Sequence, residues 1–396
     1  MAKKREFMLS SKHHLFRGLF LVNFLISLGF GISDAFFPLF CQSIGARGLL
    51  LGVAVSIYAL SKIILSPIMG QLADRFGRRP LVYGSLTLYL LVACSYLATE
   101  NLVIVICLRL LQGASCAMFR PVVQALLADS TKVEKRGSVM GSFDISFYAA
   151  LSIGPAIGGI IMDYWGFPGL FSVLILCSLS AFGLAVVMLP RQFEITIRSG
   201  QTTKAGFKSL CQQGGTYSGL LFFIFGRACG IATYATFFPI LLASKLGMSG
   251  MQIGAIMTST TLVMAVLLRP AGKIADIMPR KLLVICGGAT VPLLYILLSV
   301  VANFTQALAV ALGIGIFSAL SQPAATALLT EEGERLGMGA SLGIFHAFLN
   351  LGFVAGSFIG AVTLSAIGVN GVFISIGLVG LISVAGFDRG LGLPCR

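Results

Sequence analysis

Long apolar stretches, interrupted only by short polar ones, constrain this chain more than any other feature. The chain has 396 residues, of which 57% are hydrophobic and only 11% charged. Many apolar runs exceed the roughly 18 residues that suggest a membrane-spanning helix. We therefore expect an all-α integral membrane protein with twelve transmembrane helices, at residues 15–40, 49–69, 80–98, 102–127, 138–162, 168–190, 216–241, 251–270, 282–302, 305–330, 338–364 and 371–387.

The positions of the 28 Lys and Arg predict how these helices are oriented. If the N-terminus is cytoplasmic, most cations between the helices fall on the cytoplasmic side, and only Arg47 and Lys245 fall outside. An even number of helices places both termini in the cytoplasm. This bias also explains the net charge of +14, so no basic stripe is left over that could bind nucleic acid. The first apolar run is too long for a signal-peptide core and lacks a small-residue cleavage site, so we expect it to be retained in a multi-pass protein of the cell inner membrane.

A charged stretch at residues 70–80, GQLADRFGRRP, recurs in degraded form at residues 272–281, GKIADIMPRK. Ionised side chains are costly in hydrocarbon, so we expect each copy to be a tight turn that faces water between two membrane helices. Glycines and a Phe-Phe-Pro sequence also repeat at an offset of 201 or 202 residues. The duplication predicts two pseudo-symmetric six-helix halves, 1–190 and 216–396, joined by a polar cytoplasmic linker, 191–215.

Three motifs carry a resemblance to a known family. Residues 70–79 are similar at every position to the loop 2–3 motif G-x-x-x-D-R-x-G-R-R of the major facilitator superfamily, and residues 109–113, RLLQG, resemble its R-x-x-Q-G motif. The fifth predicted helix resembles the antiporter motif G-x8-G-x3-G-P-x2-G-G, with Ala150 in place of one glycine and with Gly141, Gly154, Pro155, Gly158 and Gly159 matching. The resemblance covers essentially the whole chain. It implies a transporter of the drug:proton antiporter type, which exports a small organic compound in exchange for protons.

The first charged turn is a candidate gate. By the resemblance, Asp74 meets the N-terminal end of helix 11 near residues 339–341, and Arg78 reaches toward Asp129. The alternative is that the cations of the turn only fix topology. In the repeat alignment Asp144 faces His346, either as a second titratable pair or as a polar contact that closes the cytoplasmic side. The expected gating residues are Gly70, Asp74, Arg75, Gly77, Arg78, Arg79, Asp129, Asp144 and His346.

Polar side chains form stripes on four apolar helices, and helices 1, 4, 7 and 10 line the central cavity in the resembled family. Eleven residues make about three helical turns, so Asn23 and Asp34 share a face, as do Arg109 and Arg120. Lys62 either snorkels to the interface or faces the cavity. The expected cavity residues are Asn23, Asp34, Lys62, Gln112, Arg120, Arg227, Tyr234 and Gln322.

Asp34 is the candidate proton-coupling acid. Burial favours its neutral form and a nearby Arg109 or Arg120 favours its charged form, so substrate and proton can compete for it. By the resemblance, Arg109 relays protons. The alternative is a permanent structural pair between helices 1 and 4. Intramembrane cations outnumber Asp34 and Asp144, which favours an anionic or zwitterionic substrate, such as a carboxylate-bearing metabolite or a siderophore-like chelator.

Other classes of protein are less compatible with the sequence. It contains no HExxH, no Walker loop and no CxxC pair, and only three His, so we expect no enzyme, no metal and no cofactor. An uptake symporter or a non-transporting receptor of the same fold remains as an alternative. We expect a monomer whose partners are a small molecule, protons and the lipid bilayer.

Overall fold

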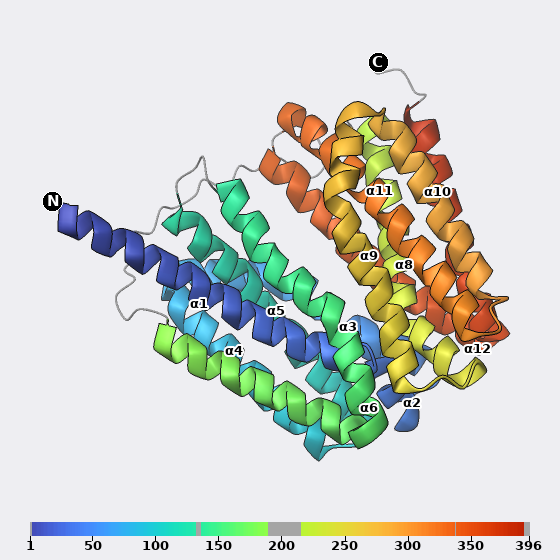
Figure 1. Cartoon of the computed structure of the whole chain (residues 1–396), viewed down its shortest axis with the longest axis horizontal. Helices are drawn as coiled ribbons and strands as arrows, with labels where there is room; N and C mark the ends of the chain where they lie inside the picture. Colours follow the sequence, from blue (N-terminus) through green and yellow to red (C-terminus); the bar gives the residue numbers. More distant parts are fainter. Residues whose placement is uncertain (1, 132–135, 189–214, 337, 392–396) are drawn as a thin grey trace. The chain divides into compact units, whose positions relative to one another are not determined.

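A computed structural model describes the chain except residues 1, 132–135, 189–214, 337 and 392–396, and Figure 1 shows it. The predicted linker, 191–215, lies outside the described residues apart from Gly215. The helices are α1 (Ala2–Asp34), α2 (Phe37–Ser43), α3 (Leu49–Phe76), α4 (Arg78–Ala98), α5 (Leu102–Ser130), α6 (Arg136–Met188), α8 (Gly215–Ile240), the π-helix η2 (Leu241–Lys245), α9 (Gly250–Ile277), α10 (Arg280–Leu298), α11 (Phe304–Leu336) and α12 (Met338–Leu391).

Ten of these helices are long and apolar enough to cross a membrane. Two of them, α6 and α12, are each interrupted by one glycine with a non-helical backbone, Gly166 at φ 63° and Gly368 at φ 78°. Glycine tolerates positive φ because it has no Cβ. Each of the two therefore comprises two helices, and every predicted segment corresponds to a helical one. The predicted class, an all-α membrane protein with the pseudo-symmetric two-half fold, is confirmed.

The chain divides into two compact units, which we describe separately. Unit 1 comprises residues 1–37 and 60–199, and unit 2 comprises residues 38–59 and 200–396. The long helix α3 is continuous, and its first part, up to Ala59, groups with unit 2.

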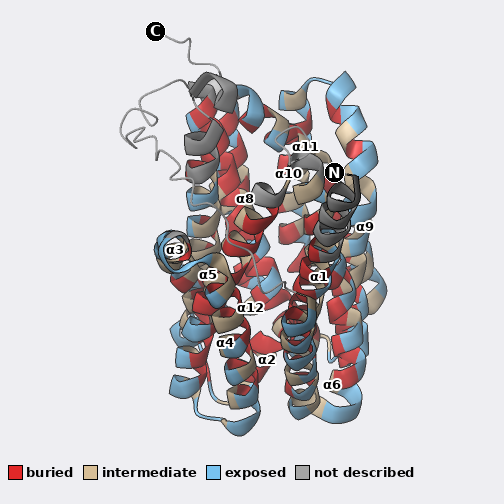
Figure 2. Cartoon of the chain, turned by 90° about the vertical axis from the view of Figure 1, so that its left-hand side faces the viewer, coloured by how far each residue is buried: buried red, intermediate tan, exposed pale blue. Residues whose placement is uncertain are grey.

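The first long helix of each unit is the most buried of its apolar spans. The share of buried residues is 56% for Leu15–Asp34 in α1 and 72% for the span that begins at Tyr217 in α8, against 28% for those in α3 and α9. Figure 2 shows buried and exposed positions alternating along the other helices. In unit 1, α1 packs chiefly against α6, and in unit 2, α8 packs chiefly against α12.

Glycines allow α1 to approach the first half of α6 very closely. A Cβ added to Gly154 would lie 2.5 Å from the carbonyl carbon of Gly31, and one added to Gly158 would lie 2.5 Å from the carbonyl oxygen of Ile32. Small residues permit such backbone contact between membrane helices. Gly141, which belongs to the same motif, is exposed, and no described atom lies within 4 Å of its Cβ position. The seam therefore begins beyond Gly141.

Unit 2 repeats this seam between α8 and the first half of α12. A Cβ on Gly356 would collide with the backbone of Cys229, and one on Gly360 with the ring of Phe237. Thr233 Oγ1 also donates a hydrogen bond of 2.9 Å to the carbonyl oxygen of Gly356. The seams of the two units occupy equivalent positions in the duplicated sequence.

The charged turn is shorter than the sequence suggested. Residues 70–76 continue α3 as a helix, and only Gly77, at φ 85°, separates them from α4. In the second copy Met278 and Pro279, at φ −94° and −57°, take the place of the turn. Glycine reverses the chain through positive φ, whereas proline fixes φ before the first turn of a helix. The expectation of a turn over the whole motif is wrong, because most of the motif lies on helix ends.

Candidate functional site

A hydrogen-bonded network in unit 1 joins three helices around Arg109. Arg109 Nη1, on α5, donates to Asp34 Oδ1 on α1 at 2.7 Å and to Gln112 Oε1 at 2.9 Å. The hydroxyl of Tyr96, on α4, donates to the same Gln112 oxygen at 2.8 Å. The structure thus brings together Asp34, Arg109 and Gln112, which the sequence had singled out, and adds Tyr96.

The two charges of this network differ in exposure. The side chain of Arg109 is 6% exposed and that of Asp34 is 34% exposed. The guanidinium carbon of Arg109 also lies 4.0 Å from the centroid of the Phe37 ring. A cation held between a carboxylate and an aromatic face is stabilised electrostatically on both sides. Arg109 is therefore held on two sides, whereas about a third of the Asp34 side chain is exposed.

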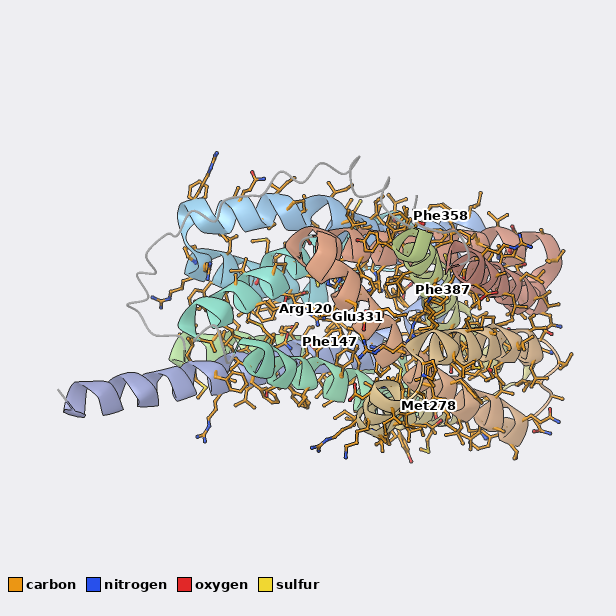
Figure 3. The ribbon with its side chains drawn as sticks, turned by 90° about the horizontal axis from the view of Figure 1, so that it is seen from above. Arg120, Phe147, Met278, Glu331, Phe358 and Phe387 are labelled. Atoms are coloured by element: carbon orange, nitrogen blue, oxygen red, sulfur yellow. The ribbon has the colours of Figure 1, made fainter. Side chains whose placement is uncertain are left out.

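A second ion pair of unit 1 lies between α5 and α6. Arg120 Nη2 donates to Asp144 Oδ1 at 3.1 Å, and the guanidinium carbon lies 4.0 Å from the centroid of the Phe147 ring (Figure 3). Arg120 therefore binds Asp144 and does not share Asp34. The fourth polar residue of these stripes, Asn23, donates to Ser146 Oγ at 2.7 Å.

In unit 2, the predicted polar residues of α8 and α11 meet around Arg227. Its two terminal nitrogens donate to Ser321 Oγ at 2.8 Å and to Gln322 Oε1 at 3.0 Å. Tyr234 is buried and shares a hydrogen bond of 2.9 Å with Thr260 Oγ1 on α9. Gln322 aligns with Arg120 in the internal repeat. The equivalent position therefore holds an amide in unit 2 and a cation in unit 1.

The remaining predicted residues are spread over both units. Lys62 is half-buried on α3, and His346 is exposed on α12. Arg75 is exposed, whereas Arg79 Nη2 contacts the hydroxyl of Tyr83 at 3.4 Å. Gly70 was expected among the gating residues, and no described atom lies within 4 Å of a Cβ on it. The side chains of Asp74, Asp129 and residues 339–341 lie outside the described residues, and with them the expected latch contacts.

Unit 2 contains an ion pair that the sequence analysis did not identify. Arg280 Nη1, at the start of α10, donates to Glu331 Oε1 near the end of α11. Arg280 follows Arg78 by 202 residues, and Glu331 follows Asp129 by the same number. The pair therefore occupies the positions equivalent to the contact expected between Arg78 and Asp129. The repeat offset was the signal that could have revealed it.

We expect Glu331→Gln to change transport more than stability. The side chain of Glu331 is 57% exposed, and exposed ion pairs contribute about 0–1 kcal/mol. The melting temperature of the purified variant should therefore stay close to that of the wild type, while its transport rate changes if the pair opens during the cycle. Arg269→Gln, which removes an exposed charge on α9, serves as the control. A large fall in melting temperature would contradict the expected surface character of the pair.

Curated proteins with similar sequences are named as drug-resistance transporters. The chain is 27% identical over 347 residues to "Multidrug resistance protein 2" of Bacillus subtilis, covering 86% of each chain. It is 24% identical over 376 residues to "Multi-drug resistance efflux pump PmrA" of Streptococcus pneumoniae, covering 90% of each.

A solved structure has the same fold at low identity. A mutant of the nucleoside transporter NupG superimposes with a TM-score of 0.79 at 10% identity, over 95% of this chain and 99% of the other. The sequence model described as "Major Facilitator Superfamily" matches residues 19–226 and 220–389, which together cover most of the chain. The described residues form ten helices of membrane length, and the family model covers most of the chain, so the chain belongs to the Major Facilitator Superfamily.

Proposed function

We propose that this protein is a secondary active transporter that exports small organic compounds across the cytoplasmic membrane by alternating access, in exchange for protons. The names of its relatives support export of drug-like compounds. The ion pair between Asp34 and Arg109 is the observation that carries the proton-coupling part of the proposal.

The ion pair between Asp34 and Arg109 is suited to couple protonation to substrate binding. A proton on Asp34 removes its negative charge, and with it the ion pair to Arg109. Arg109 then keeps the neutral acceptor Gln112, so the network has two arrangements with different charge. A ligand that favours one arrangement shifts the population of both, and this links substrate binding to protonation. An ionisable group within a membrane-spanning segment is costly and is commonly part of an ion or substrate pathway.

The charged turn is the proposed gate. Asp74 and Arg78 would close the cytoplasmic side in unit 1, and the ion pair between Arg280 and Glu331 would have the equivalent role in unit 2. Both termini would lie in the cytoplasm, as the distribution of Lys and Arg favours. A monomer suffices for this mechanism.

A second candidate is a proton-coupled transporter of an anionic metabolite or chelator, in either direction. The position of Arg227 beside neutral acceptors supports this candidate. Transport assays distinguish the two candidates by the charge of the substrate and by the direction of the gradient that drives it.

Proteoliposomes with an acidic lumen provide the test. We expect the reconstituted protein to accumulate ethidium or norfloxacin in the lumen, and nigericin, which dissipates the pH gradient, to abolish the accumulation. Accumulation only with an alkaline lumen would indicate proton symport instead of antiport. Failure of both gradients to drive any compound, together with no counterflow of labelled compound, would refute a transport function.

A further inference from the structure

Arg17 is a cation on the outer face of the first apolar span. This span covers Leu15–Asp34 in α1, so Arg17 is its third residue. Arg17 is exposed, whereas Leu15 and Leu19 are 1% and 0% exposed and belong to the core of unit 1. Among the residues that the structure describes, Arg17 has no hydrogen-bond or ion-pair partner. A charge in a membrane span is costly unless water or an anionic group reaches it.

The face of α1 that carries Arg17 is otherwise apolar. Leu21 and Phe24 follow Arg17 at helical spacing, Leu21 at 42% exposure and Phe24 half-buried. Asn23 and Asp34, which belong to the polar stripe of α1, lie roughly 100–120° around the helix from Arg17. An apolar stripe on a membrane helix faces lipid, whereas a path for water or substrate is lined by polar groups. Arg17 therefore faces lipid, at the end of the span that is nearer the N-terminus.

A shallow surface groove adjoins this cation. Phe16, Arg17, Phe20 and Leu21 line it, and it has room of about 270 Å³. The ring centroids of Phe16 and Phe20 lie 6.1 Å apart, and Phe16 also packs against the core of unit 1, so this wall is held in place. The stem of an arginine can cover apolar surface while its guanidinium reaches a polar partner. The groove thus combines an apolar floor with one cation at its edge, which matches an acyl chain joined to an anionic headgroup.

The second half of the chain has no counterpart of Arg17. At the offset of 201 residues that aligns the Phe-Phe-Pro sequences, Arg17 corresponds to Ser218. Ser218 is also exposed, and it lies at the start of the span that begins at Tyr217. The fold of one half therefore does not require a cation at this position, and Arg17 is a feature of unit 1 alone.

The sequence before the span adds further positive charge. The first 17 residues contain five Lys or Arg and one acidic residue, Glu6. Basic clusters next to a membrane span attract anionic lipids. Orientation of the span explains cations that precede it, but an exposed cation within the span adds a cost that orientation does not require.

From these observations we propose that Arg17 and the groove beside it bind one anionic phospholipid, with the phosphate on Arg17 and an acyl chain along Phe20 and Leu21. A guanidinium can donate two parallel hydrogen bonds to one phosphate. A zwitterionic lipid binds more weakly, because its headgroup brings a second cation close to Arg17. This surface is separate from the proposed transport mechanism, and lipid binding is measured without transport.

Native mass spectrometry of the full-length protein in detergent provides the test, because it counts the lipid molecules that remain bound. Phosphatidylglycerol is the probe, and phosphatidylcholine with the same acyl chains has a phosphate but no net charge. Free glycerol phosphate has the phosphate but no chain for the groove. We expect phosphatidylglycerol to bind more tightly than either. Equal affinity for the two lipids, or equal affinity for free glycerol phosphate, would overturn the proposal.

Variants then locate the lipid. Arg17→Gln should weaken phosphatidylglycerol binding about fivefold, the loss expected for one cation at a membrane surface. Arg17→Lys keeps the charge without the fork and should give an intermediate affinity. Leu21→Ser should weaken binding without changing the charge. The control Arg47→Gln removes an exposed cation that lies between two spans, and should bind as the wild type does. Unchanged affinity in Arg17→Gln, or an equal loss in the control, would place the lipid elsewhere and overturn the proposal.

Melting temperatures distinguish a lipid contact from a structural role of Arg17. In phosphatidylcholine nanodiscs Arg17→Gln should melt at the temperature of the wild type, because Arg17 has no partner in the described part of the chain. Phosphatidylglycerol should raise the melting temperature of the wild type more than that of the variant, since a ligand stabilises the state that binds it. A variant that melts several degrees lower in phosphatidylcholine alone would show that Arg17 stabilises the fold, contrary to the proposal.

Discussion

Asp34→Asn is expected to abolish transport driven by a pH gradient while leaving counterflow exchange of the same compound in place. The amide cannot take up or release a proton, so the network around Arg109 loses its two charge states. Exchange without a gradient needs only binding and alternation, which the amide permits. Proteoliposomes that hold the same amount of protein measure both activities side by side.

A loss of stability must be separated from a loss of coupling in this variant. Arg109 is 6% exposed, and removal of its charged partner leaves a buried charge uncompensated, which costs about 3–5 kcal/mol when both groups are fully buried. The cost here is smaller, because Asp34 is 34% exposed. The double variant Asp34→Asn with Arg109→Gln should recover part of the lost melting temperature without recovering coupling. Proton-driven transport that persists in Asp34→Asn would show that the pair is structural.

The second large effect is expected from Gly154→Ala. Its Cβ would lie 2.5, 2.8 and 2.9 Å from three backbone atoms of Gly31, and backbone cannot move aside as a flexible side chain can. The two helices must separate, and overpacking of this kind typically costs about 1–3 kcal/mol. We therefore expect a melting temperature several degrees lower and a large loss of transport activity.

Gly141→Ala is the matched control for this change. Gly141 belongs to the same motif and to the same helix, but no described atom lies within 4 Å of its Cβ position. Alanine there should be neutral or should stabilise the helix by up to about 1 kcal/mol, the difference in helix propensity. Equal effects of the two substitutions would mean that the motif does not act through close packing against α1.

The architecture was predictable because its physical cause, the series of long apolar runs, can be read directly in the sequence. An apolar run of membrane length has few alternatives to a helix. The repeat at 202 residues shows the pattern of each half a second time. The pairing of Asp34 with an arginine of helix 4 could likewise be expected, because a carboxylate within a membrane span needs a cation, and Arg109 and Arg120 were the two candidates on helix 4. Helical periodicity did not choose between Arg109 and Arg120, since both lie on the same face.

The other contacts of the site depend on the position of each helix along its axis and on its rotation about that axis. Neither is encoded in a local sequence pattern. Tyr96, Phe37 and Phe147 complete the two arginine sites, yet nothing in the sequence links any of them to an arginine. The extent of the turn was overestimated for a related reason. Charged residues must leave the hydrocarbon, but a helix end that extends into water satisfies this requirement as well as a turn does.

The two glycine seams also determine when each half can assemble during synthesis. The hydrogen bonds that accompany them, Asn23 to Ser146 and Thr233 to Gly356, both join residues 123 positions apart. At a typical rate of about 5–20 residues per second, the ribosome takes on the order of ten seconds to make this length of chain. During that interval the first helix of each half lacks its partner across the glycine seam. Each seam can therefore form only after the fifth membrane helix of its half has been made.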